Sequence, residues 1–298
     1  MEEKIEILPV LLLEEESAHV AELKGLARRL NLEFGWHYLL DLTWILSQLE
    51  TIANMRIMDA GAGVGLMQWY LAQHGAQVIS VDRDSRAHLP ARFRQMFQVE
   101  GLRDEDLSPL TQIPPRNQQD LTRYLKNAGK RIKAEGLNIL SSKSSSKAQG
   151  KVLLYNQDLK QLVDVPDNSL DAVVAVSSLE HNSPDDLKPV VGELMRVLKP
   201  GSPLLATLGA AKDEDWFHVP SKGWCYSEGS LRRAFDFSSE VPSNYAEYDP
   251  LMTELTNCKS LRENLASFYF HSGENGMPWG VWEPQYQPVG VCKTKRYD

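Results

Sequence analysis

A glycine-rich turn between two apolar runs is the feature of this sequence that most constrains its fold. The first run, Ile57 and Met58, ends in Asp59, and glycines then alternate at positions 61, 63 and 65. An amphipathic segment follows, and a second apolar run ends in Asp82. Strand, glycine turn, helix, strand and terminal acid predict a βαβ unit of the nucleotide-binding type.

The glycines have a physical role in such a unit. A side chain at these positions would hold a ligand away from the backbone, and glycine also permits the φ values of a tight strand-to-helix turn. Asp82, 21 residues after Gly61, is placed to accept hydrogen bonds from a ribose diol. A tight turn without a ligand is the alternative interpretation, because any βα turn can carry glycines.

The glycine spacing separates two classes of nucleotide-binding protein. A dinucleotide dehydrogenase has GxGxxG, which places a pyrophosphate on the helix N-terminus, whereas this chain has GxGxG. Asp59, two residues before the first glycine, would repel a pyrophosphate but can orient a cationic amino-acid ligand. The pattern resembles motif I of the class I methyltransferases that depend on S-adenosylmethionine (SAM).

The resemblance implies a set of cofactor-binding residues. In the family, the acid and the glycine loop hold the methionine end of SAM, and the acid after the second strand holds the ribose. The acid after the third strand meets the adenine. The residues expected to bind SAM, or its product S-adenosylhomocysteine (SAH), are therefore Asp59, Ala60, Gly61, Ala62, Gly63, Gly65, Asp82, Arg83, Asp158, Leu159, Ser177 and Tyr38.

Two later segments support the resemblance. Val165–Asp171 matches the family's turn into strand four, and Leu198–Gly201 matches its approach to strand five. The run Ser169–Leu208 resembles the small-molecule branch that includes the quinone-biosynthesis methylases. The helix inside this run has Ser183 as its N-cap, followed by a proline and two aspartates in its first turn.

Composition gives broader limits. The chain has 298 residues, of which 42% are hydrophobic and 24% are charged, as in ordinary globular proteins. No apolar run reaches the length of a membrane span, and the N-terminus lacks the pattern of a signal peptide. Three widely spaced cysteines predict neither a disulfide framework nor a metal pair, so we expect a cytoplasmic protein.

A basic insertion interrupts the resemblance over residues 86–150, between the second and third strands. Residues 83–151 hold 14 Lys and Arg against 7 Asp and Glu, although the whole chain has a net charge of −8. A helix is predicted over Asn117–Lys133 and a low-complexity loop over Ser141–Lys147. The insertion is either a lid that favours an anionic acceptor or a solvated, family-specific decoration. The overall negative charge argues against nonspecific nucleic-acid binding.

Aromatic residues gather before and after the predicted core. Two helices, over residues 14–30 and 36–49, precede it, and the second begins with Trp36, His37 and Tyr38. Residues 211–298 hold 15 of the 25 aromatic residues and include a predicted last strand, Pro288–Lys293, antiparallel at the end of the sheet. These rings either form a substrate pocket or pack in the core. The pocket candidates are Trp36, His218, Trp224 and Tyr226.

Histidine is the candidate for proton transfer. Methyl transfer requires mainly alignment and exclusion of water, and a base helps when the acceptor is a hydroxyl or an amine. His181 follows the fourth strand and is the first candidate, and His37, which Asp41 could orient, is a weaker one. Similar quinone O-methyltransferases carry an extra acid where this chain has Ser177, so no metal is expected.

Taken together, the patterns predict a Rossmann-like α/β class I methyltransferase with a mostly parallel seven-stranded sheet and helices on both faces. The expected parts are a helical cap over 1–53, a SAM-binding core over 54–211 and a substrate-side extension over 212–298. The predicted reaction is methyl transfer to a small or medium-sized acceptor, with oxygen slightly preferred over nitrogen or carbon. The alternatives are a nucleic-acid methyltransferase that uses the basic insertion and a non-catalytic SAM-binding protein.

Overall fold

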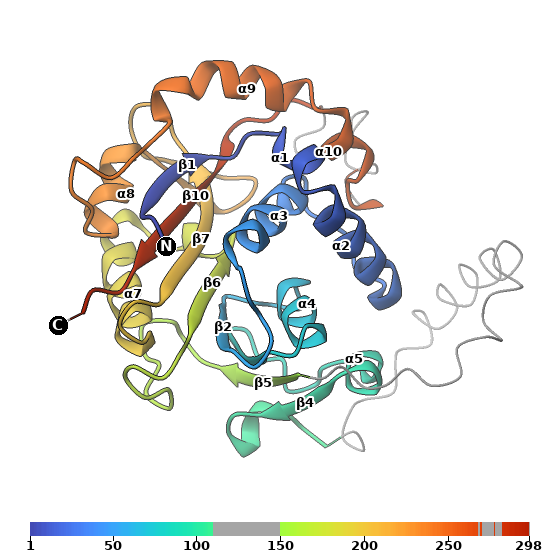
Figure 1. The fold of residues 1–298 in the computed structure, drawn as a ribbon. Helices are drawn as coiled ribbons and strands as arrows, with labels where there is room; N and C mark the ends of the chain where they lie inside the picture. Colours follow the sequence, from blue (N-terminus) through green and yellow to red (C-terminus); the bar gives the residue numbers. More distant parts are fainter. Residues whose placement is uncertain (110–149, 268, 270–276, 278–281, 298) are drawn as a thin grey trace, which may run out of the picture.

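A single β-sheet forms the centre of the molecule (Figure 1). The computed structural model describes residues 1–109, 150–267, 269, 277 and 282–297. Within these residues the sheet has ten strands. Eight of them lie in the order β1 (Lys4–Ile7), β10 (Gln287–Thr294), β7 (Pro203–Ala210), β6 (Ala172–Val176), β2 (Arg56–Ala60), β3 (Gln77–Asp82), β5 (Lys151–Asn156) and β4 (Gln98–Gly101). A short hairpin, β8 (Trp216–His218) and β9 (Gly223–Tyr226), joins the sheet beside β7.

Most neighbouring strands are parallel, from β4 through to β7. β10 runs antiparallel to both of its neighbours, β7 and β1. Because the carboxyl ends of parallel strands share one edge of the sheet, the loops after β2, β3, β5, β6 and β7 gather there. The chemistry predicted from the sequence lies on these loops.

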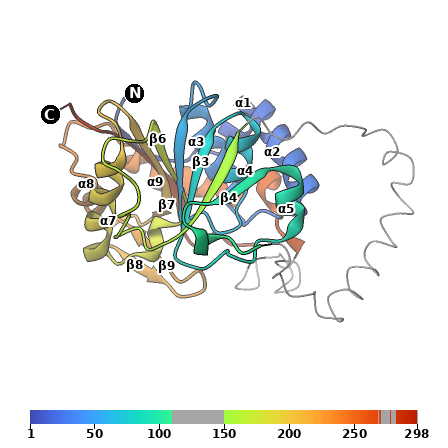
Figure 2. The same ribbon diagram turned by 90° about the horizontal axis from the view of Figure 1, so that it is seen from below.

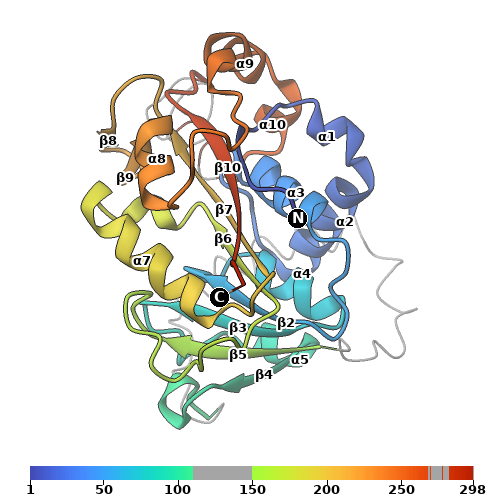
Figure 3. The same ribbon diagram turned by 60° about the vertical axis from the view of Figure 1, so that its left-hand side comes forward.

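Helices cover both faces of the sheet (Figures 1 and 3). α2 (Ser17–Leu30), α3 (Tyr38–Gln48) and α4 (Met67–Gln73) lie on one face, and α7 (Pro184–Val197) and α8 (Glu228–Ala234) lie on the other, as Figure 2 also shows. The remaining helices and turns are α1 (Leu12–Glu15), α5 (Ala91–Met96), α9 (Tyr248–Thr256), α10 (Lys259–Glu263), η1 (Asp104–Asp106), η3 (Leu179–His181) and η4 (Tyr245–Glu247).

The alternation of strand side chains produces two separate hydrophobic cores. Ile57 of β2 packs with the α2, α3 and α4 cluster, while the next residue, Met58, packs with the α7 and α8 cluster. Val78 and Ile79 of β3 divide in the same way. A strand buried on both faces reads as a continuous apolar run, and this explains the runs seen in the sequence.

The predicted fold class is confirmed, with three differences in detail. The sheet has ten strands in the described residues rather than seven. The N-terminal region is not wholly helical, because β1 pairs with β10 and lies outside it, so β10 is not the end of the sheet. The start of the insertion is also part of the sheet, because β4 pairs with β5.

The rest of the insertion lies beyond what is described. The helix predicted over Asn117–Lys133 and the loop over Ser141–Lys147 fall outside the described residues. In the part of the chain that the structure covers, no helix combines the length and apolar character needed to cross a bilayer.

Candidate active site

The glycine loop after β2 is shaped by close packing on one side and is open on the other. Gly61 and Gly63 have φ values of 74° and 49°, in the left-handed region that favours glycine. A Cβ at Gly61 would lie 2.4 Å from the Cβ of Ser178, so this glycine lets the loop pack against the end of β6. At Gly63 the nearest atom to such a Cβ is an oxygen of Asp82, 3.8 Å away. Bare backbone therefore faces open space at Gly63.

Asp82 ties the end of β3 to this loop. Its Oδ2 accepts a hydrogen bond from the Gly63 amide at 2.7 Å, and its Oδ1 accepts one from the Asp84 amide at 2.8 Å. The side chain is only partly buried, and each carboxylate oxygen can accept a second hydrogen bond. Asp82 can hold the loop and still accept from a ligand hydroxyl.

Asp59 is the buried acid beneath the loop. Its side chain is 2% exposed, and burial raises its pKa to about 7, which the charge of Arg86 opposes and that of Asp82 reinforces. A carboxyl group with such a pKa is readily ionised by a neighbouring cation. This environment suits a positively charged ligand beside the loop.

A buried network that the sequence analysis missed holds the loop from below. Arg86 donates to the carbonyls of Gly63 at 3.1 Å, Ser80 at 2.6 Å and Tyr155 at 3.2 Å, and also to the Ser80 hydroxyl. Gln68 on α4 accepts from the Ser80 hydroxyl at 2.7 Å and directs its amide nitrogen at the loop carbonyls, at 3.1 to 3.4 Å. A glutamine inside the otherwise apolar face of α4 was the only sequence signal for it.

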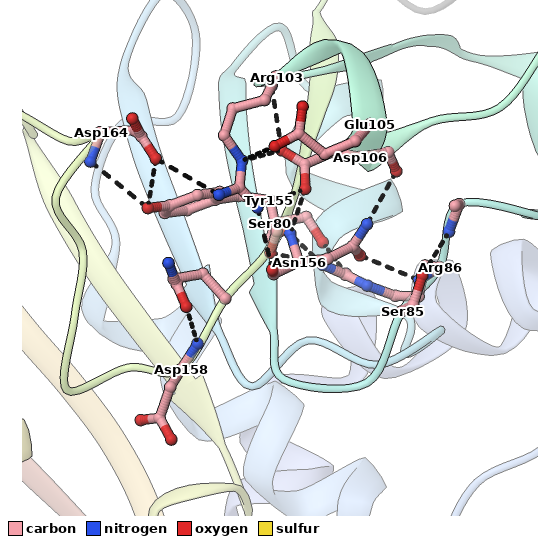
Figure 4. A network of polar contacts seen from close by, with 12 residues as sticks. Ser80, Ser85, Arg86, Arg103, Glu105, Asp106, Tyr155, Asn156, Asp158 and Asp164 are labelled. Carbon is pink, nitrogen blue, oxygen red and sulfur yellow. Dashed lines mark hydrogen bonds and ion pairs between the residues drawn. The ribbon is translucent and has the colours of Figure 1, made fainter.

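A second network fixes the end of β5, where adenine contacts were expected (Figure 4). Asp106, which is fully buried, accepts from the Asn156 amide at 2.9 Å, and Arg103 bonds Asp106 and lies over the Tyr155 ring, 4.9 Å from its centroid. Asp158 points away from this network in Figure 4 and accepts only from the Lys160 amide among the hydrogen bonds described for its carboxylate. The network therefore positions the strand end and leaves Asp158 available.

The end of β6 brings a buried carboxylate to the same edge. Ser177, with a φ of 46°, donates from its hydroxyl to Oε1 of Glu180 at 2.7 Å, and Ser178 donates to the Ala60 carbonyl at 2.6 Å. Glu180 is 5% exposed, and its Oε2 has no hydrogen-bond partner among the described residues. Burial raises the pKa of Glu180, and the nearby His37 opposes this.

An imidazole–carboxylate pair lies beside Glu180. Nδ1 of His37 is 2.6 Å from Oδ2 of Asp41, and both side chains are buried. Burial lowers the pKa of His37, but the charge and hydrogen bond of Asp41 outweigh it and raise the pKa overall. Nε2 of the same ring is 3.3 Å from the Tyr286 hydroxyl. Asp41 thus orients His37, as the sequence suggested.

Comparison with known families agrees with this architecture. Residues 121–206 match the model of the Methyltransf_11 family, described as a methyltransferase domain. The chain carries a methyltransferase domain. The match covers less than a third of the chain, and the strand order and the glycine turn after β2 agree with a class I, SAM-dependent methyltransferase. The matched segment ends within β7 and does not include the glycine loop.

Solved methyltransferase structures are similar to this chain at low identity. Phosphoethanolamine N-methyltransferase 2 of Haemonchus contortus, solved with SAM, is 13% identical, with 96% of this chain and 59% of that chain covered and a TM-score of 0.49. The 1,6-didemethyltoxoflavin-N1-methyltransferase of Burkholderia thailandensis, solved with SAH, is 12% identical, with 97% and 88% covered and a TM-score of 0.43. A search of curated proteins found no match.

The remaining predicted site residues of the methyltransferase fall in different places. His181 is exposed, with Nδ1 3.0 Å from the Lys222 carbonyl oxygen. Trp36 and His218 are both buried and both lie against Tyr286, at ring distances of 5.2 and 5.0 Å. They therefore belong to the same cluster of rings as His37.

Three other predicted residues lie apart from this cluster. Tyr226 lies in the α7 and α8 core and borders a hollow of about 550 Å³ between those helices. Trp224 packs against Phe217 of the β8–β9 hairpin, at a ring distance of 5.6 Å. Arg83 is exposed.

The residues around the glycine loop determine which cofactor or metal the site can hold. The open backbone at Gly63, the buried acid Asp59 and the spare acceptor capacity of Asp82 fit the methionine and ribose parts of SAM. In the described residues, no three His, Cys, Asp or Glu side chains come together as a metal site.

Proposed function

We propose that this methyltransferase acts on a small or medium-sized acceptor bound at the carboxyl ends of β6 and β7. The observation that supports this most directly is the contact between Ser178 and the glycine loop, because it joins two parts of the site. The cofactor loop lies on one side of this contact, and Glu180 and His37 lie on the other. A donor and an acceptor held on either side of it would be neighbours.

The residues proposed to hold SAM are those around the glycine loop. The loop backbone from Ala60 to Gly65 and Asp59 would bind the methionine part, Asp82 the ribose, and Asp158 with Leu159 the adenine. When bound, SAM supplies an electrophilic methyl group, whose transfer breaks the C–S bond, leaves the electron pair on sulfur and forms a bond to the acceptor. The protein contributes alignment, exclusion of water and removal of a proton.

Among the histidines, two can take that proton. His181 stays a candidate base, because an Nδ1–H directed at the Lys222 carbonyl would leave Nε2 as an acceptor. Its exposure to solvent weakens the case for it. The buried pair of His37 and Asp41 is the second candidate.

The proposal is tested by ligand-induced stabilisation together with turnover. SAH should raise the melting temperature and NAD should not, because only a ligand of the folded state stabilises it. Formation of SAH from SAM with a small-molecule panel would support catalysis. Stabilisation by SAH without turnover on any acceptor class would favour the non-catalytic alternative, and salt-dependent RNA binding would favour the nucleic-acid alternative. Stabilisation by NAD alone would refute the cofactor.

The three cysteines are free thiols, and two of them are buried. We propose a reducing cytoplasm as the location, because such thiols persist there.

A further inference from the structure

Glu180 has a hydrogen-bonding capacity that the described protein leaves unused. One carboxylate oxygen accepts from the Ser177 hydroxyl, and the other, Oε2, has no partner in the described part of the chain. The residue is 5% exposed. Leaving a buried acceptor unpaired is destabilising, and more so when it is charged. Such an atom at the acceptor side of a proposed active site indicates that a ligand completes it.

The described charged groups around Glu180 make no hydrogen bond to its Oε2. Its electrostatic neighbours include His37 and Asp41 at the start of α3 and His181 on η3. Nδ1 of His37 is 2.6 Å from Oδ2 of Asp41, so the imidazole already has a carboxylate partner. His181 is exposed, so solvent screens its effect. Burial, together with the charge of Glu180, raises the pKa of Tyr38 and of Cys225, and both are therefore neutral. Buried His37 is paired with Asp41, and none of these groups donates a hydrogen bond to Oε2 of Glu180.

A cluster of aromatic rings lies on the His37 side of this carboxylate. Trp36, His37, Tyr286 and His218 form a chain of ring contacts with centroid distances of 4.5 to 5.6 Å. These four side chains are buried, whereas Tyr38 at the start of α3 is 39% exposed and lies 5.3 Å from the His37 ring. Aromatic faces attract cations and exclude water from them. The cluster therefore has the composition of a site for an organic cation.

We propose that the methyl acceptor is an amine that arrives as an ammonium ion, and that Oε2 of Glu180 binds it. This rests on the proposed function, because it places the acceptor in the same site. The ammonium proton passes to the Glu180 carboxylate, which leaves the nitrogen lone pair free for the new N–C bond. The acceptor atom is then nitrogen, rather than the oxygen that the sequence favoured slightly.

An anionic group at the reacting end is disfavoured by the same geometry, because it would meet an unpaired carboxylate in a water-poor site. An anionic group elsewhere on the acceptor remains compatible. SAM also carries an ammonium group, and Asp59 is the acid proposed to receive it. The two assignments are separable, because they involve different acids on β2 and η3 and different ligands.

The test compares three probes that differ only in their reacting group. Phenethylamine, 2-phenylethanol and 3-phenylpropanoate are titrated into the protein saturated with SAH, and each is then offered as an acceptor with SAM. We expect binding of the amine, and a product heavier by one methyl group. Glu180→Gln keeps the shape and the Ser177 contact but removes the charge. It should weaken amine binding by roughly 10- to 100-fold, the value of one or two charge-assisted hydrogen bonds.

Two controls separate this from other outcomes. Glu254→Gln makes the same change on the exposed surface of α9 and should bind the amine like the wild type. Glu180→Asp keeps the charge and should retain more affinity than Glu180→Gln. SAH affinity should be unchanged in all variants.

The proposal is overturned if the amine does not bind at millimolar concentration, if the alcohol or the acid binds as well as the amine, or if Glu180→Gln binds it normally. A parallel loss of SAH affinity in Glu180→Gln would instead assign Glu180 to the cofactor, which also overturns it. Failure of SAH to bind the wild type would refute the proposed function itself, before any amine is added.

Discussion

Replacing Arg86 with lysine should weaken cofactor binding while leaving the methyl-transfer step largely intact. The guanidinium reaches four acceptors, including the Gly63 carbonyl of the glycine loop and the Ser80 carbonyl of β3. Lysine keeps the positive charge near Asp59 and Asp82 but has a single nitrogen, which cannot span acceptors on three segments. At least one or two charge-assisted hydrogen bonds are lost, and the carbonyls stay buried.

The magnitude follows from those bonds. Each is worth about 1.5–3 kcal/mol, so Arg86→Lys should lower the free energy of unfolding by about 2–4 kcal/mol. If about 1 kcal/mol, half of the lower estimate, is lost from cofactor binding because the loop is less well held, the Kd for SAH rises by roughly fivefold. Calorimetric titration of SAH gives the Kd, and urea denaturation gives the stability. Steady-state kinetics should show a raised KM for SAM with little change in kcat.

The matched control is Arg29→Lys on the exposed side of α2, where the arginine contacts only Gln73 among the hydrogen bonds described for it. It should leave SAH affinity and stability within error of the wild type. An Arg86→Lys variant that binds SAH with unchanged affinity would refute the claim that this network positions the loop.

Three further predictions concern stability. Asp59 has a folded-state pKa of about 7 against 3.8 for the free side chain, so between these values the folded state binds a proton that the unfolded state has lost. The free energy of unfolding of the ligand-free protein should therefore fall by about 4 kcal/mol as pH rises from about 4 to 7. Urea titrations across this range should show that Asp59→Asn removes the fall. Gly290→Ala would place a methyl group 2.4 Å from the Trp44 ring and should lower the free energy of unfolding by about 3 kcal/mol. Gly192→Ala in α7, where the added methyl group meets nothing within 4 Å, should raise the free energy of unfolding by roughly 0.5–1 kcal/mol. Equal effects of the two variants on thermal unfolding would contradict this. Ser183→Ala removes the N-cap of α7 and should cost about 1 kcal/mol without altering SAH affinity, as melting curves and titration would show.

Local signals in the sequence were sufficient for much of the fold. The glycine turn, the alternating cores of β2 and β3 and the caps of α7 each depend on residues close in the chain. The structure has Ser183 accepting from the Asp186 amide, as its position before Pro184 predicted. The carboxyl-end location of Asp82 and His181 also followed, because parallel strands leave little choice.

Long-range pairings were not predictable in the same way. β1 is only four residues long, and it is a strand because β10, more than 280 positions away, supplies its partners. Arg86 was counted with the charges of the insertion, although it is 6% exposed and points under the glycine loop. No motif distinguishes such an arginine from a solvated one. Its role depends on the Ser80, Tyr155 and Gly63 carbonyls, which come from three segments.

The pairing of β1 with β10 has a consequence for how the protein is made. Residues 4–7 are synthesised more than 280 positions before their partners in strand 287–294. Before β10 is synthesised, the apolar side chains of Ile5 and Ile7 lack the strand beside which they are buried in the folded protein. β1 can thus join the sheet only after residues 287–294 have been synthesised, and a ribosome that stalls before residue 287 would hold a chain in which β1 has not paired with β10.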